Sequence, residues 1–131
     1  MRRSKVIAAA AVTLLVSAPI AARSASELPF TQQAFSAAQK SGKPAPEEIW
    51  ASWCPSCAAQ ARNLSQIDTD PGFQELVIYN VKFDEQKDAL RAMNVRMQST
   101  LVVFHGNTEK GRSTGDIDAA SIKALVAKAG Q

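Results

Sequence analysis

The sequence contains few of the residues that build metal and nucleophilic centres. Its 131 residues include only two cysteines and one histidine. A phosphate-binding glycine loop, a nucleophilic serine motif and paired histidines are all missing, so the usual signatures of nucleotide-binding, serine-hydrolase and zinc-peptidase sites are absent. Internal repeats, low-complexity tracts and long linkers are missing too, which indicates a single globular unit.

The first residues predict an export signal. Three positive charges between residues 2 and 5 precede an uncharged apolar stretch at residues 6–22 that ends in small residues. We expect residues 1–24 to be a signal peptide and residues 25–131 to form the mature domain, in the periplasm or another exported location. A membrane anchor is the alternative, because roughly 17 to 25 apolar residues span a bilayer. The alanine content and Pro19 favour cleavage instead.

Removal of the signal changes the charge balance. Four of the fifteen basic residues, Arg2, Arg3, Lys5 and Arg23, lie in the signal or at its end, which leaves eleven basic against twelve acidic residues, a net charge of −1. The mature chain has no basic cluster interleaved with aromatic residues. Nucleic acid is therefore not an expected partner.

Hydrophobic periodicity predicts alternating helices and strands. We expect helices over residues 31–40, 55–67, 85–93 and 116–129, and strands over residues 48–51, 76–83, 100–104 and 111–114. The Gly106-Asn107 pair marks a hairpin turn between the last two strands. This order predicts an α/β fold in which a mixed central sheet is flanked by helices on both faces.

Cys54 and Cys57 stand where an expected strand meets an expected helix. The first sulfur would lie beside the unsatisfied N–H groups and the positive dipole end of the helix, a setting that stabilises a thiolate. Pro55 suits the first helical position. Both cysteines remain after signal removal, in a compartment where disulfides persist, and no other cysteine is present for a structural bridge.

The segment at residues 49–57, IWASWCPSC, resembles the active site of the thioredoxin superfamily. The W-x-x-W-C-x-x-C pattern is more specific than a bare C-x-x-C, and the element order agrees over essentially the whole mature chain. The resemblance implies a thioredoxin-like fold and a thiol–disulfide oxidoreductase. In that enzyme Cys54 is the nucleophile, and a more buried Cys57 resolves the mixed disulfide. Trp53 would cover one side of the pair.

Further site residues follow from the same resemblance. The family places a buried acid six positions before the first cysteine, and Glu48 at that position could relay the proton of Cys57 through water. The alternative is that Glu48 is a surface residue of a frayed strand. The groove for a partner chain would be formed by Trp53, Pro55, Ser56, Gln98 and Ser99. No cofactor and no bound metal is implied.

Ser99 departs from the family pattern. The superfamily has a cis-proline there, opposite the cysteines. A cis bond before a non-proline residue costs about 2.5 to 4 kcal/mol, so we expect the Gln98–Ser99 bond to be trans and the groove to be reshaped. Ser99 Oγ would then lie close to one of the two cysteines, or Gln98 and Ser99 would simply turn the chain into the next strand.

Residues 45–48, APEE, also depart from the pattern, because the family has an apolar central strand there. Proline donates nothing to a strand ladder, and charges are costly inside a protein. We expect the strand either to start only at Glu48 or to bulge at Pro46. A third departure is Ala58, which replaces a lysine of many relatives and removes a positive charge.

Protein thiols or disulfides and a redox-recycling partner are the expected partners of a monomer. The tryptophan-flanked site and small size favour a reductase, although direction depends on reduction potential. Membrane contact would occur only through the signal peptide or a membrane-bound electron donor. Two alternatives remain open. One is a metal-binding or metal-delivery protein that uses the cysteines with His105. The other is a non-catalytic binding module with a static disulfide.

Overall fold

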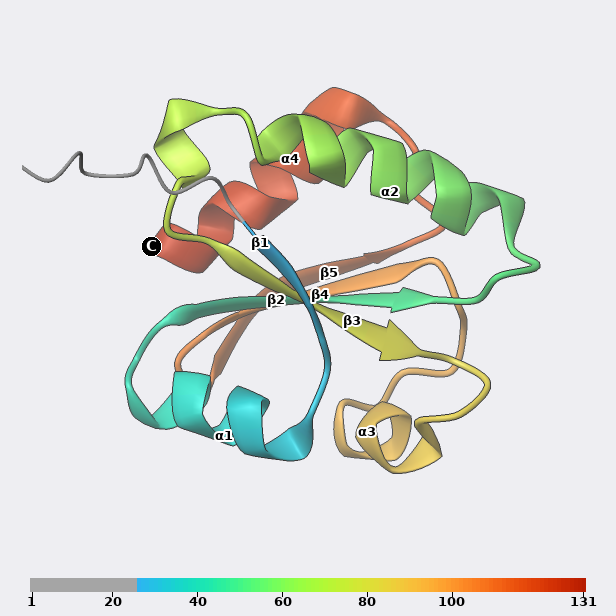
Figure 1. Cartoon of the computed structure of the whole chain (residues 1–131), viewed down its shortest axis with the longest axis horizontal. Coiled ribbons are helices and arrows are strands. Elements are labelled where there is room, and N and C mark those ends of the chain that lie inside the picture. Colours follow the sequence, from blue (N-terminus) through green and yellow to red (C-terminus); the bar gives the residue numbers. More distant parts are fainter. Residues whose placement is uncertain (1–25) are drawn as a thin grey trace, which may run out of the picture.

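The computed structural model describes residues 26–131, so the expected signal peptide lies outside the described residues. A five-stranded sheet separates two pairs of helices (Figure 1). The strands are β1 (Ser26–Pro29), β2 (Pro44–Trp50), β3 (Val77–Lys82), β4 (Thr100–His105) and β5 (Thr108–Thr114). The helices are α1 (Gln32–Lys40), α2 (Pro55–Ile67), α3 (Lys87–Ala92) and α4 (Ala119–Ala127), with short 3-10 turns η1 (Pro71–Phe73) and η2 (Lys128–Gly130).

The sheet is mixed, in the order β1-β3-β2-β4-β5. β1 and β2 run parallel to β3, whereas β4 is antiparallel to both β2 and β5. In Figure 1, α1 and α3 cover one face and α2 and α4 cover the other. The expected α/β architecture with helices on both faces is therefore confirmed. In the described part, no helix is both long and apolar enough to cross a membrane.

Each face of the sheet has its own apolar core. Under α1 and α3, Phe35 packs in a tilted contact on Phe30 and edge-on against Phe104. Under α2 and α4, the buried side chains include Leu64, Ile78, Leu101, Val103 and Ile122. Side-chain caps start the helices as the sequence indicates, since Thr31 accepts from the Ala34 N–H and Asp118 from that of Ser121.

Strand β1 was not predicted. Its four residues, Ser26–Pro29, are all exposed, so the segment lacks the apolar alternation by which a strand is recognised. The strand forms through its parallel pairing with β3, where Glu27 lies opposite Ile78. Its side of the sheet is one of the two open edges.

The expected start of the central strand was wrong. β2 begins at Pro44, and Pro46 lies inside it, opposite Val103 of β4 and without a bulge. Its parallel pairing with β3 starts one residue later, at Glu47. Glu47 is fully buried among side chains of the α1 face, and burial raises its pKa to about 9. The side chain therefore enters the core as a neutral acid. Burial of a neutral acid costs less free energy than burial of a charge, and that cost was the reason not to expect a strand here.

Strand β5 is longer than expected and forms the other open edge. It starts at Thr108, and a register shift beside Val103 accommodates it against β4. Most of its side chains are polar and partly or fully exposed. Arg112 pairs with Glu109 along the strand and also donates to the backbone carbonyls of Met93 and Asn94.

Candidate active site

Cys54 and Cys57 form a disulfide at the start of α2. Cys54 is the N-cap residue of the helix, and its sulfur accepts a hydrogen bond of 3.1 Å from the Cys57 N–H. Pro55 occupies the first turn, where it has no N–H to leave unpaired. Ser56 Oγ lies 3.4 Å from the Cys54 sulfur. The first sulfur thus sits at the helix N-terminus, in the position that stabilises a thiolate.

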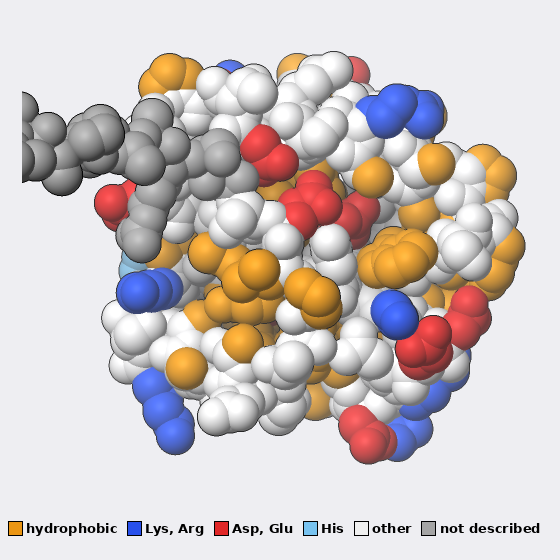
Figure 2. Space-filling model, viewed as in Figure 1, with side chains coloured by type: hydrophobic (Ala, Val, Ile, Leu, Met, Phe, Trp, Pro, Cys, Tyr) orange, Lys and Arg blue, Asp and Glu red, His pale blue; other side chains and the backbone are white. Residues whose placement is uncertain are grey.

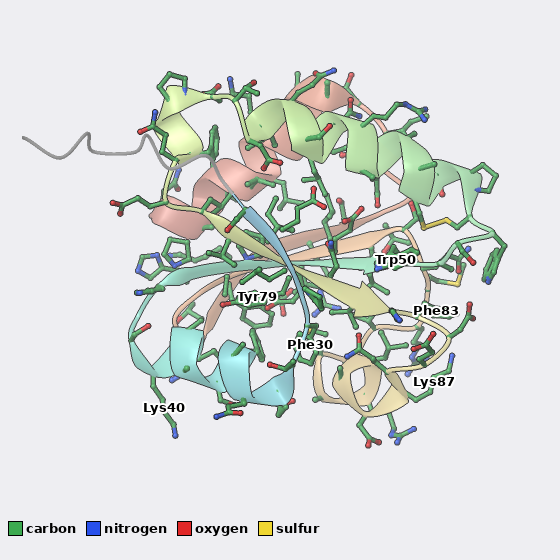
Figure 3. The ribbon with its side chains drawn as sticks, in the orientation of Figure 1. Phe30, Lys40, Trp50, Tyr79, Phe83 and Lys87 are labelled. Carbon is green, nitrogen blue, oxygen red and sulfur yellow. A yellow bond between two sulfur atoms is a disulfide. The ribbon has the colours of Figure 1, made fainter. Side chains whose placement is uncertain are left out.

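Both cysteines are nearly closed to solvent. Cys54 is 4% exposed and Cys57 is 3% exposed, so in the disulfide state the expected difference in burial is absent. They pack with Ala51 in a small cluster that Trp50 and Phe83 border. Figure 3 shows Trp50 and Phe83 at the end of the sheet near the disulfide. The disulfide therefore lies buried between the start of α2 and the end of the sheet.

Glu48 lies in the same cleft as the two cysteines. The cleft has a volume of about 280 Å³, and Glu48 and Trp50 line it together with Cys54 and Cys57. Glu48 is 3% exposed, so the interpretation as a surface residue of a frayed strand is wrong. Among the described residues, its Oε1 and the indole Nε1 of Trp50 are buried without hydrogen-bond partners, and a cleft of this size has room for water.

Glu27 and Asn80 complete the polar side of this cleft. The Asn80 amide donates to Glu27 at 3.3 Å, and Asn80 is also the register partner of Glu48 across β2 and β3. Burial, and next the negative charge of Glu27, raise the pKa of Glu48 to about 7. Figure 2 shows acidic side chains gathered between β1 and α2. Glu27 was not predicted to matter, because its strand was not predicted.

Trp53 is exposed at the rim of the site. Its side chain is 56% exposed, and its Nε1 donates to Asp84 at 2.8 Å. Met97 and Ile117 are also exposed apolar side chains. Their segments precede β4 and follow β5, and Thr100 pairs with both Ile49 and Thr114, so these segments meet at the cysteine end of the sheet.

The loop that precedes β4 differs from the family pattern in the expected way. The Gln98–Ser99 bond is trans, and Ser99 has a φ of 57°. Ser99 is buried, but its Oγ has no hydrogen-bond partner among the described residues, so it bonds to neither sulfur. Gln98 is partly exposed. Of the two groove residues expected here, only Gln98 is open to a partner.

Gln60 is a site residue that the sequence pattern concealed. In the sequence, Ala58, Ala61, Leu64 and Ile67 recur at helical spacing, but the buried face of α2 is Cys57, Gln60, Leu64 and Ile67. Gln60 is fully buried, and its Nε2 donates to the carbonyls of Ser99 and Asp116. Its spacing from Cys57 and Leu64 places it on the inner face, which a binary polar pattern does not reveal.

His105 lies away from the cysteines. It pairs with Pro44 at the start of β2, whereas the cysteines follow Trp50 at the other end of that strand, and its Nδ1 contacts the Ala129 carbonyl. Within residues 26–131, no group of three or more histidine, cysteine and acidic side chains is arranged to hold a metal ion. Among the described residues, the cleft brings together the two cysteines, Glu48 and Glu27.

Comparisons with known proteins agree with this geometry. The Thioredoxin family model matches residues 27–128. Thioredoxin 1 of Chlorobaculum tepidum is 30% identical over 83 residues, which cover 63% of this chain and 80% of that protein. The crystal structure of Trxlp from Edwardsiella tarda superposes with a TM-score of 0.73 at 34% identity and covers 78% of this chain and 98% of that one.

A more distant structure, the thioredoxin of Malassezia sympodialis, superposes with a TM-score of 0.70 at 20% identity, covering 83% of this chain and 93% of that one. It supports the fold alone. The family match extends over most of the described residues and includes β2, the cysteine pair and the Ser99 loop. The chain therefore belongs to the thioredoxin family and is a thiol–disulfide oxidoreductase.

Proposed function

We propose that this protein is an exported reductase of protein disulfides that works through Cys54, Cys57 and Glu48. The observation that carries the proposal is the disulfide at the N-terminus of α2, with a buried carboxyl group in the same cleft. The exposed apolar side chains of Trp53 and Met97 beside the cysteines suit contact with an unfolded or flexible client segment.

The exchange starts from the reduced protein. The Cys54 thiolate attacks one sulfur of the client disulfide, a Cys54–client bond forms, and the other client sulfur leaves as a thiolate. The Cys57 thiolate then attacks the Cys54 sulfur. This step forms the Cys54–Cys57 disulfide and releases the second client sulfur. Two electrons pass from the cysteine pair to the client, so a recycling partner must return two electrons to the protein.

Glu48 would accept the proton of Cys57 in the second step. A thiol attacks only as its thiolate, and Cys57 is almost fully buried, so bulk water has little access to its proton. A carboxyl group with a pKa of about 7 can accept a proton and release it again near neutral pH. Water in the cleft would connect the two groups, because the cleft has polar atoms without protein partners.

Two measurements test this function. Equilibration with glutathione gives the reduction potential, and a reductase requires a value below about −180 mV, the potential of protein disulfide isomerase. A value well above it would assign the opposite direction of electron flow. In the second measurement, a Cys57→Ser variant cannot resolve the mixed disulfide and so traps the client on Cys54. Cys54→Ser, which lacks the nucleophile, is the matched control and should capture nothing.

Export is the second part of the proposal, and it rests on the basic and apolar pattern of residues 1–24. Expression of the full chain in a bacterium should give a periplasmic protein that starts between residues 23 and 26, as measured by intact mass. Replacement of the basic residues at positions 2, 3 and 5 by glutamate should leave the precursor in the cytoplasm. A full-length product in the membrane fraction would indicate an anchor instead.

A further inference from the structure

We propose that Gln60 is a positioning residue for the client chain, because its carboxamide holds the backbone that the client would contact. The inference rests on the proposed exchange with protein disulfides. It starts from the fully buried position of Gln60 on α2, one turn after Cys57. The Gln60 side chain thus connects the two elements that form the groove, which are helix α2 and the loop before β4.

The Gln60 amide group makes two hydrogen bonds. Its Nε2 donates to the Ser99 carbonyl at 3.0 Å and to the Asp116 carbonyl at 2.8 Å. The Ser99 carbonyl also accepts from the Gly115 N–H at 2.7 Å. Helix α2, the loop before β4 and the segment after β5 therefore meet at this one amide.

The neighbouring contacts fix the same region. Asn63, one turn further along α2, donates to the Ile117 carbonyl at 2.9 Å. Thr100 Oγ1 donates to the Met97 carbonyl at 2.8 Å, which holds the other end of the loop. The Met97–Ser99 loop is thus fixed on both sides. Ser99 nevertheless adopts a left-handed φ of 57°, which residues other than glycine rarely take.

Gln98 stands between the two fixed carbonyls. Within residues 26–131, its backbone N–H and C=O form no hydrogen bond, and the residue is partly exposed. A pair of free backbone groups at the end of a strand can pair with an extended peptide, which gives affinity through main-chain hydrogen bonds. The orientation of the Gln98 backbone depends on the neighbouring Ser99 peptide group, which Gln60 holds.

A buried glutamine is an expensive way to fill this position unless its hydrogen bonds are needed. Its Oε1 is buried without a partner among residues 26–131, so an apolar side chain would suit the core better. The two donated hydrogen bonds offset only the cost of burying the amide nitrogen, not that of burying the oxygen. The geometry thus points to a role in holding the loop, where the trans Gln98–Ser99 bond replaces the usual family arrangement.

The test compares two disulfides with the reduced protein. One is a synthetic peptide pair joined by a single disulfide, and the other is hydroxyethyl disulfide, which has no peptide backbone. Release of the product thiols is measured by chromatography after acid quench. In Gln60→Met, which keeps the length of the side chain but has no donor, we expect the rate constant with the peptide to fall about tenfold, as the loss of an aligned hydrogen bond would produce.

The rate constant with hydroxyethyl disulfide should stay within about twofold, because that substrate makes no backbone contacts. Gln66→Met, an exposed substitution on the same helix, is the matched control and should leave both rate constants unchanged. Equal losses for both substrates, or no loss for the peptide, would overturn the positioning role.

Gln60→Asn provides the same comparison if Gln60→Met does not fold. Its amide is too short to reach both carbonyls, so the peptide rate alone should fall. The wild-type protein separates the two proposals. If the wild type reacts with neither disulfide, the exchange function fails, whereas a reactive wild type with an unchanged ratio in the Gln60 variants refutes only the role of Gln60.

Discussion

Glu47 and Glu48 are adjacent in β2 but lie on opposite faces of the sheet. Glu47 pairs with Tyr79 and Val102, which belong to the core under α1 and α3, whereas Glu48 pairs with Asn80 and lines the cysteine cleft. Burial raises the pKa of both, to about 9 for Glu47 and about 7 for Glu48. The alternation of a strand thus gives two neighbouring acids different environments and different uses.

Replacement of Glu48 by glutamine should slow the resolving step. In the wild type, the carboxylate that accepts the proton becomes populated as the pH rises through about 7, so the rate of resolution should rise with an inflection there. Loss of a general base typically costs 100-fold or more, and we expect a fall of about 10- to 100-fold at pH 7. Rapid mixing of a preformed Cys54 mixed disulfide from pH 5.5 to 8.5 measures the rate.

The matched control for that experiment is Glu75→Gln, an exposed substitution before β3. It should keep the rate and the inflection of the wild type. Survival of the inflection near pH 7 in Glu48→Gln would assign the titration to another group.

Replacement of Glu27 by glutamine should move the same inflection to lower pH. The charge of Glu27 is the second cause of the raised pKa of Glu48, after burial, so its removal lowers that pKa. The shift should be smaller than about one pH unit, because Glu27 is exposed and partly screened. A wild-type inflection that moves down in 1 M salt, and a variant inflection insensitive to salt, would agree with this cause. An unchanged inflection in the variant would contradict it.

Replacement of Glu47 should change how stability depends on pH. The folded protein holds the Glu47 proton up to about pH 9, whereas the unfolded chain releases it near pH 4.5. The free energy of unfolding therefore decreases as the pH rises from about 4.5 to 9, by about 1.4 kcal/mol per unit for one such group. Glu48 adds a smaller decrease that ends near pH 7.

Urea unfolding at pH 5, 7 and 9 measures this dependence. Glu47→Gln removes the ionisable group, so its stability should decrease less between pH 7 and 9 than that of the wild type. Glu75→Gln again serves as the control and should follow the wild type. A wild type equally stable at pH 7 and 9 would show that Glu47 does not bind the proton.

Substitutions at Ser99 should reveal the cost of its backbone conformation. Ser99→Gly should remain folded with a free energy of unfolding within about 1 kcal/mol of the wild type, because glycine adopts the left-handed region readily. Ser99→Val should be less stable than Ser99→Gly by about 1 to 3 kcal/mol, since a β-branched residue is strained there. Urea unfolding at pH 7 compares them. Equal stability of the two variants would place the loop in another conformation.

The sequence predicted most of the fold because most elements carry their own signals. Helix α2 begins at Pro55, directly after its N-cap Cys54, and α4 shows the apolar spacing of Ile122, Leu125 and Val126. β1 has no such signal, since its residues are exposed and only pairing with β3 defines it. The start of β2 was missed for a related reason. Pro46 and Glu47 contradict a buried strand locally, and the raised pKa of Glu47 keeps its side chain neutral in that environment.

The residues of the site that belong to a sequence motif were predictable. The positions of Cys54, Cys57 and Glu48 follow from a short segment, and the structure brings all three to one cleft. Gln60 and Glu27 lie outside that motif, and their importance depends on tertiary contacts to Ser99 and Asn80. The site of Trp53 on the rim, held by Asp84, likewise depends on a contact 31 residues away in sequence.

The two edges of the sheet have a consequence for how this protein can handle unfolded chains. β1 ends in Pro29, and β5 carries Lys110 and Arg112 along the other edge. Prolines and positive charges on an edge strand discourage the addition of a further strand, which is the first step of aggregation. Both edges therefore oppose strand addition by a second chain, and we expect the protein to resist edge-to-edge aggregation at high concentration.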